Sequence, residues 1–275
     1  MVGKLLKHEF RATGRIMLPL LGALIVLSGL ATLSFRGIES TENSLFSVMM
    51  GLVIVVFFLG LFAAAVMAVV LMVQRFYKNL MRDEGYLMLT LPVGVHGLVW
   101  SKLIVSTLWI LVTGLVATAL FIFTISSLDT QNFSYIFIQF PKEFWQALQE
   151  GGITADFLAF AAELLLLMIL SVLAQCLHFY AAMALGHCFS KDKVLLSVVF
   201  YIAISFALQA LSVLFSAVLY GGAKSIVLLT TDMGFDAVAP ALHSMMLRAA
   251  VMQLLEGAIL YLLTVLPMKK GLNLA

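Results

Sequence analysis

Long apolar runs separated by short polar segments dominate the pattern of the chain. Six of these runs are about as long as the roughly 20 residues with which a helix crosses a bilayer, or longer. They cover residues 16–35, 45–73, 103–125, 157–186, 194–219 and 244–267. The pattern therefore predicts an all-α integral membrane protein, with residues 1–275 forming a single transmembrane domain.

The composition supports this prediction. Of the 275 residues, 63% are hydrophobic and 11% are charged, and the mean hydropathy is +1.11. A soluble domain cannot bury so large an apolar fraction. The two cysteines, Cys176 and Cys188, lie in or beside one apolar run, which argues against a disulfide framework. The basic N-terminus leads directly into a run long enough to span, so we expect no cleaved signal peptide.

Lysine and arginine are distributed unevenly among the segments that connect the runs. If the N-terminus is cytoplasmic, twelve of the sixteen Lys and Arg residues lie on the cytoplasmic side and four on the outer side. Most acidic residues of the connecting segments lie on the outer side. The positive-inside bias then predicts that both termini are cytoplasmic, which an even number of spans also requires.

The first fifteen residues carry a basic stripe. Lys4, Lys7, Arg11 and Arg15 follow helical spacing, and apolar residues lie on another side. Such a pattern predicts an interfacial helix over residues 1–15, with the basic stripe towards anionic lipid headgroups. The alternative is a positively charged flank that only fixes the orientation of the first span.

Two connecting segments, 126–156 and 220–243, are predicted to be extracellular. The first contains the sequence FPKEFWQALQEGG, in which Pro141 can begin a short helix and Gly151 with Gly152 can end it. Aromatic residues in this stretch would place the helix at the outer membrane interface. They are Phe140, Phe144 and Trp145.

The predicted cytoplasmic loop 74–102 has dense charge of both signs. Its first part shows the pattern of an amphipathic helix, which Pro92 would end. The basic face contains Arg75, Lys78 and Arg82, and the apolar face contains Phe76, Leu80 and Leu87. This helix suits docking to a soluble partner, but a solvated loop with ordinary positive-inside charge would explain the same residues.

The loop resembles the corresponding loop of ABC-2-type permeases, the membrane subunits of certain bacterial ABC exporters. Those proteins commonly show a DEGYL…TLPV…SK pattern there, preceded by a basic LLKxEF-type N-terminus. The matching positions here are 83–87, 90–93, 101–102 and 5–10. Gly94 departs from the serine that often follows TLPV. The motif covers the N-terminal third, whereas the six-span layout covers the whole chain.

The resemblance implies a permease subunit in the bacterial plasma membrane that moves drug, peptide or lipid cargo out of the cytoplasm. It also implies a coupling helix within residues 75–92, seated in a cleft of a separate ATPase subunit that binds ATP and Mg, and braced by the N-terminal helix. Two copies, or one copy with a similar permease, would enclose the path as a homodimer or heterodimer. The ATPase-coupling residues implied are Arg75, Lys78, Arg82, Asp83, Glu84, Gly85 and Tyr86.

Motifs of enzymes and metal sites are absent from the sequence. No GxxxxGK[ST] occurs, and residues 222–225 match only its end, so we expect ATP hydrolysis in a partner and no enzyme activity here. Cys176, His178, His187 and Cys188 are metal-ligand types, but the first two point about 200° apart on a helix. We therefore expect no metal site and no nucleic-acid partner.

Two carboxylates, Glu163 and Glu256, lie inside predicted spans, where a charge is costly unless it faces protein or water. Glu163 lies near the outer end and can reach the interface. Glu256 is deeper and shares a face with Gln253, so the pair forms either a buried polar contact or part of a translocation path. These carboxylates carry the alternative function, an ATP-independent channel or ion-coupled carrier. A non-transporting anchor or sensor for an ATPase is a third possibility.

Overall fold

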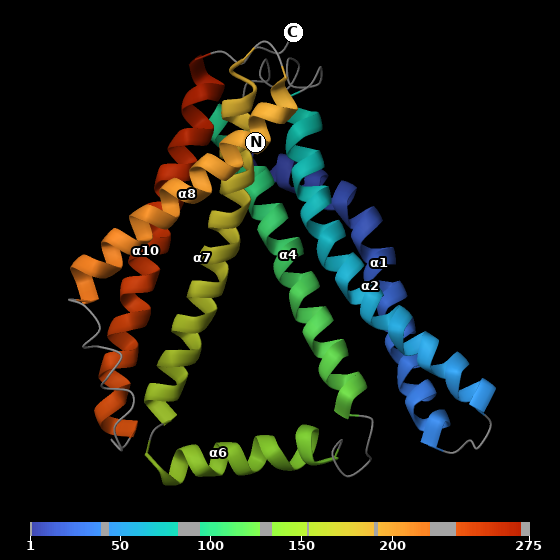
Figure 1. Cartoon of the computed structure of the whole chain (residues 1–275). Coiled ribbons are helices and arrows are strands. Elements are labelled where there is room, and N and C mark those ends of the chain that lie inside the picture. The colour runs from blue at the N-terminus through green and yellow to red at the C-terminus, as the bar shows by residue number, and fades with distance from the viewer. Residues whose placement is uncertain are drawn as a thin grey trace. The chain divides into compact units, whose positions relative to one another are not determined.

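The computed structural model describes residues 2–39, 44–81, 94–126, 134–152, 154–189, 192–220 and 235–270, and these are almost entirely helical (Figure 1). The α-helices are α1 (Val2–Glu39), α2 (Ser44–Phe76), α4 (Val95–Ser126), α6 (Phe140–Glu150), α7 (Thr154–Gly186), α8 (Lys193–Tyr220) and α10 (Phe235–Lys270). Two short π-helical segments, η1 (Tyr77–Met81) and η2 (Tyr135–Gln139), adjoin α2 and α6.

Six of these helices contain stretches long and apolar enough to cross a membrane, which confirms the predicted spans. The stretches are Gly3–Phe35, Ser44–Met81, Val95–Ser126, Thr154–Gly186, Lys193–Phe215 and Ala239–Lys269. Large apolar side chains remain exposed along all six. A helix that is apolar on every side is typical of a lipid environment.

Several helices extend beyond the apolar runs. The third predicted span begins at residue 103, but α4 begins at Val95, where the Gly97 N–H already donates to the Gly94 carbonyl at 2.8 Å. Polar residues do not end a helix, whereas proline and glycine do, so the helix starts just after Pro92 and Gly94. Likewise α1 is continuous from Val2 to Glu39, and the interfacial position of residues 1–15 stays a prediction.

The chain divides into two compact units. The N-terminal unit contains residues 3–72 and 108–154, and the C-terminal unit contains residues 1–2, 73–107 and 155–275. In the N-terminal unit, α1 packs on α4 through two hydrogen bonds. The Trp109 indole N–H donates to the Thr13 hydroxyl at 2.8 Å, and the Ser28 and Thr124 hydroxyls bond at 2.9 Å. Hydroxyl residues of this kind are enriched where membrane helices approach closely.

The short helix predicted in the segment 126–156 is confirmed as α6. Pro141 lies in its first turn, Gly151 caps its C-terminus, and Gly152 follows with a φ of 66°. The helical conformation already begins before Pro141, because η2 leads directly into α6 and the Phe140 N–H donates to the Tyr135 carbonyl. At Gly152, glycine takes a positive φ without steric cost. Phe140, Phe144 and Trp145 are exposed. Their location at the outer interface stays a prediction.

In the C-terminal unit, α7 contacts four other segments. Its Tyr180 meets α2 through Phe76 and α4 through Ser106. His178 meets α8, and Glu163 meets α10. The unit is therefore organised around α7, and the candidate sites lie along this helix.

Candidate functional site

The first part of the loop predicted to couple to an ATPase is helical. The chain continues from α2 through η1 to Met81, which confirms the helix predicted at the start of the loop. Arg75 is half-buried and Lys78 is exposed. The other predicted coupling residues lie outside the described residues; they are Arg82, Asp83, Glu84, Gly85 and Tyr86. The whole of the DEGYL…TLPV motif, residues 83–93, also lies outside them.

Phe76 and Leu80, two of the three residues of the predicted apolar face, are buried, and Leu87 lies outside the described residues. The Phe76 ring stacks on Tyr180 of α7, with centroids 3.9 Å apart and planes within 10°. The Tyr180 hydroxyl bonds to Ser106 of α4 at 2.9 Å. The ends of α2, α4 and α7 therefore meet at one fully buried tyrosine.

The π-helical segment η1 forms a second contact with α7. Tyr77 lies edge-on to the ring of His187, with centroids 5.4 Å apart. His187 is buried, and its Nδ1 lies 2.8 Å from the Met183 carbonyl oxygen. Burial lowers the pKa of His187, and the nearby charge of Lys193 lowers it further, against the opposing effect of the backbone bond. The structure thus favours a neutral ring here. π-Helical turns frequently mark functional sites.

Two other matched motif segments are packed inside their units. In the LLKHEF segment, Glu9 is buried and the Phe10 ring lies 5.5 Å from the ring of Trp109 in α4. In the SK segment, both Ser101 and Lys102 are buried, and the Ser101 hydroxyl donates to the Leu98 carbonyl at 2.8 Å. A bracing role for the N-terminal helix stays a prediction.

Gln253, one of two residues predicted on a translocation path, lines a cavity of about 230 Å³ between α4, α7 and α10. Glu256 does not line this cavity and is half-buried elsewhere on α10. Gly257 and Tyr261 follow Gln253 along the wall at steps of four residues, which drift only about 40° around a helix. A step of three residues leads about 60° the other way, which separates Glu256 from the cavity.

Beside this largely apolar cavity lie hydrogen bonds of Tyr261 that the sequence did not indicate. The Tyr261 hydroxyl lies 2.6 Å from His96 Nδ1, and the Trp100 indole N–H also bonds to it. Gln253 Oε1 is buried and has no hydrogen-bond partner within the described part of the chain. The spacing of Gln253, Gly257 and Tyr261 was the signal that could have indicated this wall.

Glu163 has a partner that the sequence did not reveal. Both of its carboxylate oxygens lie within 2.9–3.0 Å of His243 Nδ1 in α10. The Phe160 ring, one turn earlier on α7, lies edge-on to the His243 ring at 6.2 Å. Glu163 is therefore joined to α10, and its position at the membrane interface stays a prediction.

The four cysteine and histidine residues considered as metal ligands have separate partners. Cys176 lies 3.9 Å from the Thr107 hydroxyl, and His178 Nε2 lies 3.1 Å from the Tyr201 carbonyl oxygen. His187 bonds to Met183, and Cys188 is exposed. Over the ranges that the structure describes, no three metal-binding side chains converge.

Six membrane-length helices with polar contacts between them define a multi-pass α-helical membrane protein. No protein-family model, curated protein or solved structure matches this chain. Its function must therefore be argued from the contacts described above together with the sequence motif.

Proposed function

We propose that the chain is the membrane-spanning subunit of an ATP-driven exporter of the ABC-2 permease type. In this proposal a separate ATPase subunit, which binds ATP and Mg, docks on residues 75–92. One observation carries it: the helical end that leads into the DEGYL segment is fixed to α7 by the buried Phe76–Tyr180 stack. The resemblance of the loop sequence supplies the identity of the partner.

The physical argument concerns how force reaches the spans. An ATPase can move membrane helices only through an element that does not yield when it is pushed. Phe76, Tyr180 and Leu80 are fully buried, and Tyr180 also bonds to Ser106 of α4. Close-packed contacts of this kind transmit displacement because they have little free volume. A movement of the segment after Met81 would thus displace α2, α4 and α7 together.

The remaining roles follow from the same proposal. The α10 face that carries Gln253, Gly257 and Tyr261 would line part of the cargo path, because these residues line a cavity between candidate spans. Two such subunits, identical or similar, would enclose the path. The cargo would be a drug, peptide or lipid, and both termini would lie in the cytoplasm of a bacterial cell.

A second candidate function is an ATP-independent channel or ion-coupled carrier. The observation that favours it is the contact between Glu163 and His243 within candidate spans, since carboxylate–histidine pairs there often relay protons. Against it, the Glu256 carboxylate does not line the α10 cavity. Such a carrier would lose transport on addition of an ionophore and would tolerate ATP depletion.

The double substitution Asp83→Ala with Glu84→Ala tests the coupling role. Truncating one side of a partly desolvated charge contact costs roughly 2–5 kcal/mol. We therefore expect weaker co-purification of the ATPase, or an intact complex whose hydrolysis no longer drives transport. The matched control replaces Glu143 and Glu150 of α6, which are exposed in a segment predicted to be extracellular. Wild-type transport and ATPase binding by the Asp83/Glu84 variant would contradict the proposal.

The proposed orientation is tested by cysteine labelling in a background that lacks Cys176 and Cys188. A cysteine introduced at Gln131 should react with an impermeant maleimide in intact cells. A cysteine at the exposed position Lys78 should react only after the membrane is permeabilised. The reverse pattern would place residues 74–102 outside and would rule out a cytoplasmic ATPase as their partner.

A further inference from the structure

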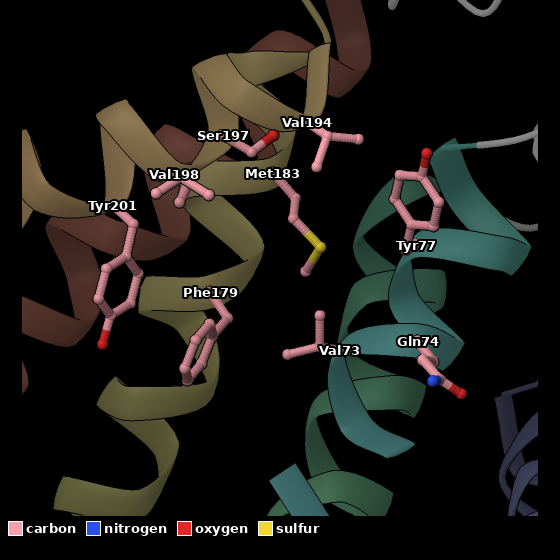
Figure 2. Close-up of a pocket in the computed structure, with 10 residues that line it drawn as sticks. Val73, Gln74, Tyr77, Phe179, Met183, Val194, Ser197, Val198 and Tyr201 are labelled. Atoms are coloured by element: carbon pink, nitrogen blue, oxygen red, sulfur yellow. The ribbon is translucent and has the colours of Figure 1, made fainter. Parts of the chain in front are cut away.

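A second cavity, of about 520 Å³, lies between the end of α2 and the adjoining ends of α7 and α8 (Figure 2). Figure 2 shows Val73 and Met183 pointing towards one another across this space. The lining is almost wholly apolar, with hydroxyl groups from two tyrosines and one serine. It consists of Val73, Gln74, Tyr77, Phe179, Ala182, Met183, Val194, Ser197, Val198 and Tyr201.

The three helix ends around this cavity lie on the same side of the membrane. The connection from Gly186 to Lys193 is too short to cross it, and the contacts of Phe76 and Tyr77 hold the end of α2 beside the end of α7. From Lys193 to Tyr201, α8 rises about 12 Å. The cavity therefore begins beside Lys193, where the candidate span of α8 starts, and extends along its apolar residues.

Positive charge gathers at the headgroup end of this cavity. Lys193 directly precedes Val194 of the lining, and it is close enough to His187 to affect the titration of that ring, which itself contacts Tyr77. Lys78 is exposed directly after Tyr77. In the described parts of these three helix ends, the formal charges are Arg75, Lys78 and Lys193 against the single carboxylate of Asp192.

The volume indicates what kind of occupant fits. A helix with side chains is about 10 Å wide and rises about 5.4 Å per turn, so 520 Å³ holds little more than one turn of a partner helix. Water is a poor occupant because the wall offers few polar partners. A flexible, unbranched hydrocarbon chain can fill such a space, and the bilayer supplies one at high concentration.

We propose that this cavity binds an acyl chain of one anionic phospholipid, whose phosphate lies between Lys78 and Lys193. Basic pockets between membrane helices recognise anionic headgroups in this way. The bound chain would fill the space between α2 and α8, which the protein itself leaves open. This inference requires the membrane but no ATPase, so it goes beyond the proposed export function and can be tested separately from it.

The test is native mass spectrometry of the purified full chain, titrated with phosphatidylglycerol or with phosphatidylcholine of the same acyl chains. We expect one tightly retained phosphatidylglycerol per chain. The double variant Lys78→Gln with Lys193→Gln should bind it roughly 25-fold more weakly, at roughly 5-fold per lysine. The control Lys4→Gln with Lys7→Gln removes the same charge from exposed positions of α1 and should leave the affinity unchanged.

A second pair of variants tests the cavity itself. Val198→Trp introduces an indole into the lining and should abolish the retained phosphatidylglycerol, whereas Val199→Trp, at the next and similarly exposed position of α8, should not. Both valines are more than half exposed, so neither change requires repacking of a core.

Three results would overturn the lipid site. Equal retention of phosphatidylcholine would show that the anionic headgroup does not contribute to binding. An equal loss of phosphatidylglycerol affinity in the α1 control would show that the lysines act only through the net charge of the protein. A change of oligomeric state in Val198→Trp, with lipid retention unaltered, would assign the cavity to a second copy of the chain. None of these measurements depends on transport, so their failure leaves the export proposal untouched.

Discussion

The two ends of α7 hold their neighbours in different ways. At the Gly186 end, Phe76 stacks on Tyr180 at 3.9 Å, and both side chains are fully buried. At the Thr154 end, Glu163 bonds to His243 at 2.9 Å, and these side chains remain 31% and 26% exposed. The first contact is a buried aromatic stack, beside the cavity between α2, α7 and α8, whereas the second is a polar contact that remains partly exposed.

The difference has a mechanical meaning. Closely packed side chains resist even a small displacement, because each gap that opens between them removes many van der Waals contacts. A partly exposed carboxylate–histidine contact contributes little free energy and can exchange partners. We infer that α7 is firmly fixed to α2 at the buried stack and is more adjustable against α10 at the other end. The following experiments test this contrast, beginning with the largest expected effect.

Removal of the buried ring should have the largest effect. Phe76→Ala deletes one half of the aromatic stack and leaves a void between α2 and α7, and such changes cost about 3–5 kcal/mol in protein cores. The unfolding midpoint in detergent should fall clearly. Phe62→Ala is the control on the same helix, because Phe62 is 71% exposed, and it should change the midpoint little. Equal shifts in both variants would mean that the end of α2 is not specifically packed.

The contact between α7 and α8 should respond next. A Cβ atom added at Gly186 would lie 2.6 Å from the Ser197 backbone nitrogen, so the two helices must separate in Gly186→Ala, at a cost of about 1–3 kcal/mol. Gly114→Ala meets no atom within 4 Å and should gain up to about 1 kcal/mol from helix propensity. Thermal unfolding of both variants checks the signs. If Gly186→Ala left the unfolding temperature unchanged, α7 and α8 would not be in close contact at this position.

The sequence predicted the features that depend on one segment alone. Hydropathy located all six spans because each run is apolar and long. Pro141 and Gly151 located α6 because these residues have specific backbone requirements. The buried face of Phe76 and Leu80 followed from their spacing beside basic residues.

Contacts between helices could not be predicted in the same way. The spans are apolar on every side, so the sequence does not reveal which face of a helix turns inward. Glu163 finds His243 only because α7 and α10 lie together, 80 residues apart in the chain. The sequence placed Glu256 on the same face as Gln253 because the two positions are three apart. The cavity is lined instead by the side of α10 that carries Gln253, Gly257 and Tyr261.

The polar end of α7 should be weaker, and a double-mutant cycle with Glu163→Gln and His243→Gln measures it. Because both side chains are partly exposed, we expect a coupling of about 0.2–1 kcal/mol. A coupling of several kcal/mol would make this end as firmly held as the other and would remove the contrast.

The smallest expected effect is the pH dependence of stability that His187 causes at the Gly186 end of α7. Burial lowers the pKa of His187 below its ordinary value of 6.5, so the folded protein holds this ring neutral. Below that value the unfolded chain binds a proton that the folded chain does not. The contribution of His187 to stability is therefore fully present above pH 6.5 and is lost as the pH falls through the lower folded-state pKa.

Unfolding midpoints measured above pH 6.5 and at lower pH should show this loss of stability. The difference between the two midpoints should be smaller in His187→Gln. The control is His8→Gln, at an exposed position of α1, which should leave the pH dependence unchanged. An unaltered dependence in His187→Gln would mean that the ring reaches solvent in the folded protein. The contact between Tyr77 and His187 would then be loose, and the Phe76–Tyr180 stack would be the stronger of the two aromatic contacts between the end of α2 and the end of α7.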